Sequence, residues 1–296
     1  MNGILNIHKP PGISSFGVVA KIRSICGERR VGHGGTLDLE ATGVLPVFIG
    51  KATRAVDYLL EWRKVYRAVI MLGIATDTYD AAGKVTGMAD ASQIKREDAL
   101  RFLSSFSGEI MQTPPMFSAL KHNGRSLYHL ARAGVSFECR SRPVTVYRIE
   151  LLGFASPSLE IEVECSRGTY IRSLAHDLGK LLGCGAHLVS LVRTRYGPFD
   201  LADALPLSGI DISFKEDAWQ DRLRPIDTVL RHLPEMIFCD EDAKIIKNGG
   251  GIAVIESPVP DNINRRYRAY NKNGEFFAVI RFNPEAELWK AEKVFM

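Results

Sequence analysis

Apolar and polar residues alternate along the chain in patterns that predict short strands separated by helices. Apolar runs over residues 3–7, 44–49 and 64–73 predict strands, and the last run has hydrophobic residues on both faces. The stretch from Leu159 to Cys165 alternates apolar residues with glutamates, as in a strand with one buried face. We therefore expect a sheet in which the strand over 64–73 is central.

Helices are predicted where apolar residues recur every three or four positions. The clearest covers residues 15–26, after a serine pair that can cap the first turn and before Gly27, which can end the last turn. Shorter helices are expected over 52–60, 94–106 and 126–132. A plain amphipathic turn explains the segment over 126–132 equally well.

A further helix is predicted directly after the strand over 159–165. Thr169 is placed to cap it, and Arg172 then falls in its first turn, where the helix dipole disfavours a cation. We therefore expect a carboxylate near Arg172. The buried side of this helix is predicted to consist of Ile171, Leu174, Leu178 and Leu181.

The length and composition of the chain predict one large domain and one small domain. The 296 residues, 46% of them hydrophobic, can bury one sizeable core and a second small one. The sequence pattern changes near Leu233, where a predicted short helix is followed by a run of glycines and a β-rich tail. We expect domains at 1–232 and 233–296.

Positive charge is concentrated in one part of the chain. The net charge is only +4, but six basic residues and a single acid lie between Lys121 and Arg148. Such a segment is typical of a surface that binds a polyanion, although a solvated face has the same composition.

Several classes of protein are disfavoured by what the sequence lacks. The five cysteines are widely separated, with no Cys-x-x-Cys pair, which argues against a disulfide framework and a zinc site. The N-terminus does not read as a signal peptide, and no stretch is long enough to span a membrane. We expect a cytoplasmic protein without a metal or nucleotide cofactor, and the absence of coiled-coil heptads favours a monomer.

Residues 32–46 hold the strongest candidate for chemistry. Three glycines surround His33 within four positions, so the backbone can take positive φ and approach another molecule closely. Asp38 follows them and precedes the buried run over 44–49, which places its carboxylate at the rim of a core. A tight turn whose aspartate caps an amide explains the same pattern.

Several motifs together resemble the TruB family of tRNA pseudouridine synthases. Gly-His-x-Gly-Thr-Leu-Asp at 32–38, followed by Ala-x-Gly-x-Leu-Pro at 41–46, is similar to the family's signature loop. Lys-Pro-Pro-Gly-x-Ser-Ser at 9–15 and Gly-Thr-Tyr-Ile-Arg at 168–172 resemble two further motifs. Gly34 stands where the family often has Thr, and Leu39 stands where Pro usually follows the aspartate.

The resemblance implies a site built around Asp38. Asp38 matches the family's catalytic aspartate, Arg172 the arginine that pairs with it, and Tyr66 the tyrosine that stacks on the target uracil. From the strand pattern alone, Tyr66 would be a core residue. The positions implied to bind substrate are His33, Tyr66, Tyr170, Arg172 and Leu191.

Other residues are expected to contact RNA. The family places an RNA-gripping insertion at about 112–142, where Phe117 stands in place of the usual Tyr. Asp80 lies in a loop that resembles the family, and it is interpreted as a supporting group, an RNA contact or a simple turn residue. The possible RNA contacts are Lys9, Asp80, Lys121, Arg132 and Arg142.

The resemblance also implies a fold and a reaction. The implied fold is α+β, with a central mixed, mostly antiparallel sheet flanked by helices and loops. A small PUA-like β-barrel that binds RNA is implied at 233–296, although a domain that only caps the structure would have a similar sequence. The reaction converts uridine 55 in the T loop of tRNA to pseudouridine by cleaving the C1′–N1 bond, rotating the uracil and rejoining it through C5. No atom is gained or lost, so the reaction requires no cofactor. It requires an ionised carboxylate, which we expect the cation of Arg172 to keep at a low pKa.

Two other functions compete with this interpretation. A glycoside hydrolase also breaks a bond at C1′ but normally needs a second catalytic carboxylate, for which Glu40 has only proximity in its favour. A non-catalytic RNA-binding or RNA-folding protein would be indicated by loss of Asp38, Tyr66 or Arg172, and all three are present. The expected partner is tRNA, bound through its T arm, with no obligate protein partner.

Overall fold

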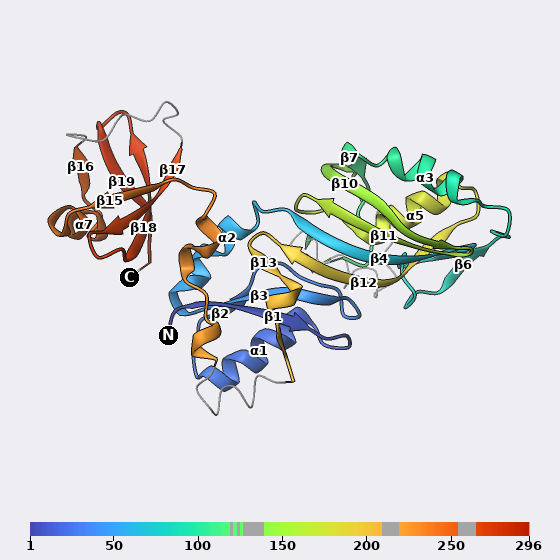
Figure 1. The fold of residues 1–296 in the computed structure, drawn as a ribbon, viewed down its shortest axis with the longest axis horizontal. Helices are drawn as coiled ribbons and strands as arrows, with labels where there is room; N and C mark the ends of the chain where they lie inside the picture. Colours follow the sequence, from blue (N-terminus) through green and yellow to red (C-terminus); the bar gives the residue numbers. More distant parts are fainter. Residues whose placement is uncertain (119–120, 123–124, 127–138, 209–218, 254–264, 296) are drawn as a thin grey trace.

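Two sheets of unequal size follow each other along the molecule (Figure 1). The computed structural model describes residues 1–118, 121–122, 125–126, 139–208, 219–253 and 265–295. Strands β1–β4, β7 and β10–β14 build the larger sheet, and strands from β15 onward build the smaller one, while β5–β6 and β8–β9 form separate two-stranded sheets. No helix within these ranges is both long enough and apolar enough to cross a membrane.

The larger sheet has ten strands in the part of the chain that the structure describes. Its main path runs through β14 (Leu205–Pro206), β1 (Gly3–Lys9), β3 (Thr42–Ile49), β12 (Ala186–Tyr196), β4 (Lys64–Leu72), β11 (Ser158–Cys165), β10 (Arg142–Ala155) and β7 (Gly108–Gln112). The remaining two strands are β2 (Val31–His33), which pairs with β3, and β13 (Phe199–Asp200), which pairs with β12. The β1–β14 and β3–β12 pairs are parallel and the others are antiparallel, so the predicted mixed, mostly antiparallel sheet is confirmed.

Strands β4 and β11 form where the apolar pattern predicts them. β4 lies inside the sheet between β12 and β11, as expected for a run with hydrophobic residues on both faces. In β11 the apolar residues are buried, whereas Glu162 lies on the other face and pairs with Arg67 of β4 and Arg148 of β10. The alternating glutamates therefore mark the face of the sheet that contacts water.

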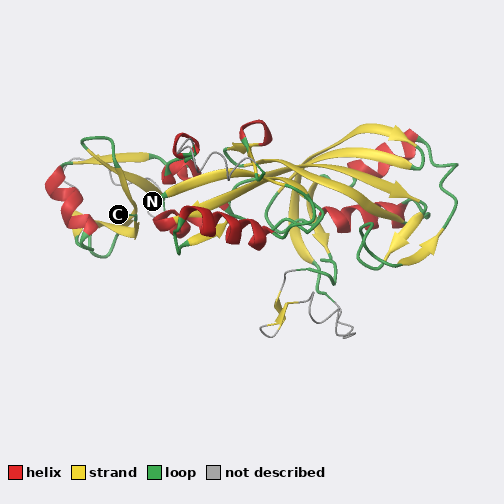
Figure 2. Cartoon of the chain, turned by 90° about the horizontal axis from the view of Figure 1, so that it is seen from below, coloured by secondary structure: helices red, strands yellow, loops and turns green. Residues whose placement is uncertain are grey.

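Helices α1 (Ser15–Cys26) and α5 (Ile171–Leu181) lie along the same side of the larger sheet (Figure 2). α1 agrees with the prediction over 15–26: the Ser14 side chain accepts a hydrogen bond from the Gly17 amide, and Gly27 ends the helix with a φ of 63°.

The ends of α5 differ from the prediction. Tyr170, not Thr169, precedes its first residue, because the Thr169 hydroxyl donates instead to the Ser166 carbonyl at 3.1 Å. Leu181 is 47% exposed and not buried, because it lies in the last turn at the edge of the apolar stripe. The other predicted members of the buried side, Ile171, Leu174 and Leu178, are buried.

The remaining helices are short. The predicted helix over 52–60 is a 3₁₀ helix, η1 (Gly50–Ala55), that continues into α2 (Val56–Leu59). The helix expected over 94–106 is α3 (Arg96–Ser104). The helix expected over 126–132 lies outside the described residues except for Ser126, which belongs to β9. The smaller elements are β5 (Ile74–Thr76), β6 (Val85–Met88), β8 (Lys121–His122), β9 (Arg125–Ser126), η2 (Leu201–Asp203), η3 (Gln220–Arg222) and η4 (Ile226–Leu230).

The smaller sheet begins at Glu235 and is covered by one helix. Its strand order is β15 (Glu235–Phe238), β17 (Arg266–Asn271), β18 (Phe276–Asn283), β19 (Leu288–Val294) and β16 (Gly251–Ala253). α7 (Asp240–Lys247) packs against it through Ala243 and Ile246. The curled sheet, seen in Figure 1, is consistent with the predicted PUA-like domain.

A shared apolar cluster joins the two parts of the chain. Val279 and Phe295 of the smaller sheet pack in one core with Tyr58 of α2 and Leu230 of η4. The Tyr58 hydroxyl also donates to Glu292 at 3.1 Å. The smaller sheet is therefore packed against the larger part and not merely tethered to it.

Gly43 provides a test of how β3 meets β12. Its φ is 103°, and a Cβ atom there would overlap the backbone of Arg193 in β12. We expect Gly43→Ala to lower the free energy of unfolding by about 2 to 4 kcal/mol, from backbone strain and overpacking. Urea denaturation measures this loss. Gly87→Ala, where a Cβ atom meets nothing within 4 Å, is the control, and an equal loss in both variants would contradict the expectation.

Candidate active site

Asp38 lies in the loop that joins β2 to β3. β2 and β3 are antiparallel neighbours, with His33 opposite Val47, so the residues between them form a closed turn. Leu37 is buried with 4% exposure, whereas 45% of the Asp38 side chain is exposed. The loop therefore anchors itself through Leu37 and presents the next carboxylate to solvent.

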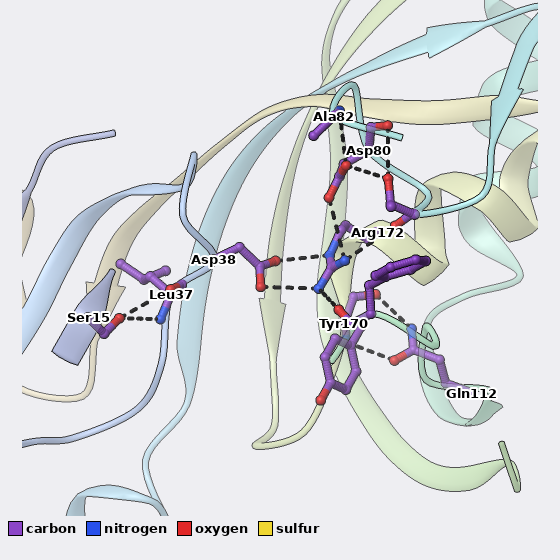
Figure 3. A network of polar contacts seen from close by, with 10 residues as sticks. Ser15, Leu37, Asp38, Asp80, Ala82, Gln112, Tyr170 and Arg172 are labelled. Atoms are coloured by element: carbon purple, nitrogen blue, oxygen red, sulfur yellow. Dashed lines mark hydrogen bonds and ion pairs between the residues drawn. The ribbon is translucent and has the colours of Figure 1, made fainter. Parts of the chain in front are cut away.

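Ser15 holds the residue before Asp38 in place. Its hydroxyl, in a residue only 1% exposed, accepts a hydrogen bond from the Leu37 amide at 2.9 Å and donates to the Leu37 carbonyl at 3.2 Å (Figure 3). A hydroxyl can make both bonds at once, which an apolar side chain of the same size cannot. The start of α1 thus fixes the backbone beside Asp38.

Lys9 holds the residue after Asp38. Its ammonium group is fully buried and donates to the carbonyls of Leu39 at 2.9 Å, Pro10 at 2.9 Å and Ile13 at 2.8 Å. Burial lowers the pKa of Lys9 to about 8. With its three protons directed at carbonyls, Lys9 supports the loop, and this placement does not favour the predicted contact with RNA.

Asp38 and Arg172 form a two-point ion pair, as Figure 3 shows. Arg172 Nε lies 2.9 Å from Asp38 Oδ2, and Arg172 Nη2 lies 3.1 Å from Asp38 Oδ1. The Arg172 side chain is only 5% exposed, so the pair joins a buried cation to a carboxylate that solvent reaches. The carboxylate expected near the first turn of this helix is therefore Asp38.

The other nitrogens of Arg172 are held by two more segments. Nη1 lies 3.5 Å from Asp80 Oδ2 and donates to the Thr78 carbonyl at 3.3 Å, and Nη2 also donates to the Phe117 carbonyl at 3.0 Å. Asp80 is itself fixed by the Thr78 hydroxyl at 2.6 Å and the Ala82 amide at 3.1 Å. Of the roles considered for Asp80, the structure places it as a support for Arg172.

The pKa of Asp38 differs from the expectation. Burial among the surrounding protein atoms raises the pKa of Asp38 above its ordinary value, Arg172 opposes this rise, and the nearby Asp80 carboxylate adds to it. The expectation that pairing with Arg172 keeps this pKa low is therefore wrong, because burial outweighs the cation. Asp38 consequently takes up a proton at a higher pH than an aspartate with an ordinary pKa does.

Tyr66 lies on β4 opposite Arg193 of β12, and burial raises the pKa of its phenol. Arg193 is 1% exposed, and its guanidinium donates to Val44 O at 2.7 Å and to Gly35 O at 3.1 Å. Its positive charge also acts on the Tyr66 phenol and opposes the rise of its pKa. Arg193 thus links Tyr66 to the loop of Asp38. The sequence analysis gave it no role, although a cation within a central strand was a signal for one.

Tyr170 is held by its backbone and its ring. The Gln112 side chain accepts from the Tyr170 amide at 2.8 Å and donates to its carbonyl at 3.0 Å (Figure 3). The Arg142 guanidinium lies 5.3 Å from the centroid of the Tyr170 ring and donates to the Gly168 carbonyl at 2.8 Å. Arg142 therefore lies against the wall of the site.

His33 and Leu191 lie at the edge of the same region. The Gly35 amide donates to His33 Nδ1 at 3.2 Å, and burial together with Arg193 lowers the pKa of His33, so its ring is neutral near pH 7. Leu191 of β12 packs against the apolar cluster that includes Tyr66. Lys121 lies in β8, apart from these residues in sequence, and Arg132 lies outside the described residues.

Known proteins resemble this chain over nearly its whole length. An H/ACA RNP bound to a substrate RNA containing 2′-deoxyuridine has a chain 28% identical, with a TM-score of 0.76 over 99% of this chain and 85% of the other. A Cbf5–Nop10–Gar1 complex has a chain 29% identical, with a TM-score of 0.75 and the same coverage.

Sequence comparison identifies the family. The model of the TruB family pseudouridylate synthase N-terminal domain matches residues 23–171, and that of the tRNA pseudouridylate synthase B C-terminal domain matches 172–231. The tRNA pseudouridine synthase B of Dehalococcoides mccartyi is 46% identical over 100% of this chain and 97% of its own length. That of Clostridium kluyveri is 41% identical over 94% and 95%. The chain therefore belongs to the TruB family of pseudouridine synthases.

The two family segments do not correspond to separate parts of the structure. Their boundary falls in the first turn of α5, between Ile171 and Arg172. β12, from the second segment, lies between β3 and β4 of the first segment. Both segments therefore contribute to one sheet and one site.

The Ser15 hydroxyl provides a test of how the loop is held. We expect Ser15→Ala to reduce the free energy of unfolding by about 2 to 4 kcal/mol, because it leaves the buried amide and carbonyl of Leu37 without partners. Ser14→Ala, which removes only a helix cap, should cost about 1 kcal/mol. Urea unfolding of both variants measures the difference, and an equal or smaller cost for Ser15→Ala would show that the loop does not depend on this hydroxyl.

Proposed function

We propose that this protein isomerises uridine 55 in the T loop of tRNA to pseudouridine. Relatives named tRNA pseudouridine synthase B match it from end to end, at 46% and 41% identity. The observation that carries the proposal is the solvent-reachable carboxylate of Asp38, gripped at both oxygens by the buried Arg172. This pair supplies the one group that the isomerisation requires.

The geometry suits a reaction that one carboxylate performs. Breaking the C1′–N1 bond and forming the C5–C1′ bond needs a group that attacks the nucleotide or removes a proton from it. Asp38 is oriented by Arg172 before substrate arrives, which removes the cost of ordering it during the reaction. A hydrolase would need a second free carboxylate to activate water, whereas Asp80 is tied to Arg172, Thr78 and Ala82.

The target uridine must leave its stacked loop to reach Asp38. We propose that Tyr66 stacks on the uracil, and that Leu191 and Tyr170 complete the pocket. Arg193 supports this arrangement, since it lies opposite Tyr66 in the neighbouring strand and donates to the Gly35 carbonyl of the Asp38 loop. His33, neutral and close to the glycines of that loop, would contact the RNA that the base has left.

The proposed site draws on three regions of the chain: Asp38 in the β2–β3 loop, Tyr66 in β4, and Tyr170 and Arg172 at the start of α5. We propose that the protein acts on the T arm as a monomer in the cytoplasm, without an obligate protein partner. The insertion over about 112–142 would grip the RNA, and the sheet after Leu233 would add to its binding.

Replacing Asp38 tests the proposed activity. Unmodified T-arm stem-loop RNA, incubated without cofactor, should gain pseudouridine at one loop uridine, and Asp38→Asn should slow this by about 10⁴-fold or more because it removes the reacting carboxylate. Carbodiimide-stop primer extension maps the product. Asp203→Asn, which alters a surface ion pair with Arg224, is the control and should match the parent.

Two results would contradict this proposal. If the parent and Asp38→Asn convert uridine to pseudouridine equally well, Asp38 is not the reacting group. Binding of the RNA by both proteins without conversion by either would favour an RNA-binding or RNA-folding protein.

The raised pKa of Asp38 makes the activity depend on pH. Asp38 must be ionised to react, so kcat should fall as the pH decreases through a pKa above the ordinary aspartate value. Asp80→Asn removes a negative charge that raises this pKa, so the acid limb of the profile should move to lower pH. Asp77→Asn, in the same loop but at a carboxylate that accepts from the Lys84 amide and does not contribute to the pKa of Asp38, should leave the limb in place. A limb that moves to higher pH in Asp80→Asn would refute the assignment.

A further inference from the structure

Tyr79 and His176 form a stacked aromatic pair near the buried ion pair. Their ring centroids are 3.8 Å apart and their planes differ by 14°. Tyr79 belongs to the loop between β5 and β6, and His176 belongs to α5. Both residues are half-buried. The stack therefore joins two elements that are distant in sequence.

Both elements also hold the ion pair of the site. His176 follows Arg172 by four residues, so the two side chains lie on the same face of α5, one turn apart. Tyr79 stands between Thr78, whose carbonyl accepts from Arg172, and Asp80, whose carboxylate pairs with it. The loop and the helix thus meet at two points, one charged and one aromatic.

Tyr79 has a backbone conformation that a large side chain rarely adopts. Its φ is 63°, in the left-handed region, which costs about 1 to 2 kcal/mol for a residue other than glycine. Its carbonyl accepts from the Leu188 amide at 3.0 Å, and the Ala81 amide donates to Leu188 O at 2.9 Å. Such strain persists only where the surroundings hold the residue in place. The stack with His176 therefore explains why a bulky aromatic side chain is found at this position.

The stack adds no charge beside Arg172 at neutral pH. Burial, together with the nearby Lys180, lowers the pKa of His176 to about 4. A neutral imidazole over a phenol packs as an ordinary aromatic pair, worth about 0.5 to 1.5 kcal/mol beyond its buried area. The contribution of the stack is therefore one of geometry and not of electrostatics.

We infer that the Tyr79–His176 stack is a positioning element of the active site. It holds the loop over 77–83 against α5, so that Asp80 stays on Arg172 and the guanidinium keeps its orientation toward Asp38. Neither ring has to touch the RNA, and the Tyr79 hydroxyl is not required. This inference rests on the proposed function and adds to it two residues that act through Asp80.

Steady-state kinetics on T-arm stem-loop RNA tests this role. Tyr79→Leu and His176→Ala should each lower kcat about tenfold while KM stays within about twofold, because a misplaced catalytic group slows chemistry more than binding. Tyr79→Phe keeps the ring and should retain the kcat of the parent. Tyr147→Leu, at an exposed tyrosine on β10, is the control for the substitution itself and should not change kcat.

A glycine variant separates positioning from folding. Tyr79→Gly removes the ring but relieves the strain of the positive φ, so its thermal unfolding midpoint should remain near that of the parent. Its kcat should nevertheless fall as far as that of Tyr79→Leu. If Tyr79→Gly keeps the parent kcat, or if Tyr79→Phe loses it, the stack does not position the site.

A double-mutant cycle identifies the route. If the stack acts through Asp80, Tyr79→Leu should lower kcat less than about threefold in an Asp80→Asn background, compared with about tenfold in the parent. Equal effects in both backgrounds would overturn the inference while leaving the proposed function intact. Absence of pseudouridine with the parent protein would instead overturn the proposed function, and the role of the stack with it.

Discussion

The structure depends most on one buried cation, Arg172. A guanidinium removed from water is costly unless its nitrogens find partners, and losing a partner costs more than the pair contributes. Arg172 meets this requirement with Asp38, Asp80 and the carbonyls of Thr78 and Phe117. Three segments distant in sequence must therefore converge at the start of α5. The position of the Asp38 carboxylate is a consequence of satisfying that cation.

The same logic extends to residues that never need to meet the substrate. Ser15 and Lys9 bind the backbone on either side of Asp38, and Arg193, opposite Tyr66 in the neighbouring strand, binds the same loop. Each is a polar group with almost no exposure, bonded to backbone amides or carbonyls. These buried polar groups thus hold Asp38 and Tyr66 in one geometry. Support of this kind keeps a site ordered before its ligand binds.

Local patterns predicted the elements, and tertiary contacts decided what those patterns left open. The apolar runs located β4 and β11, Ser14 and Gly27 bounded α1, and the helix dipole at Arg172 required a carboxylate that proved to be Asp38. The pKa of Asp38 could not be predicted in the same way, because it depends on a balance between burial and charges that only the fold brings together. The burial of Lys9 and the Tyr79–His176 stack could not be predicted either. Both depend on contacts between segments distant in sequence, and no local pattern indicates such contacts.

The place of β12 has a consequence for synthesis of the chain. β3 and β4 are made early, but the strand that lies between them ends at Tyr196, more than a hundred residues later. Until the ribosome has made β12, β3 and β4 each keep an unpaired edge. Asp38 likewise has no ion-pair partner until Arg172 has been synthesised. Because pairings between such distant segments form slowly, the nascent protein passes through a stage in which exposed strand edges invite association with other chains. The Asp38–Arg172 ion pair and the closure of the sheet are thus completed by the same late segment.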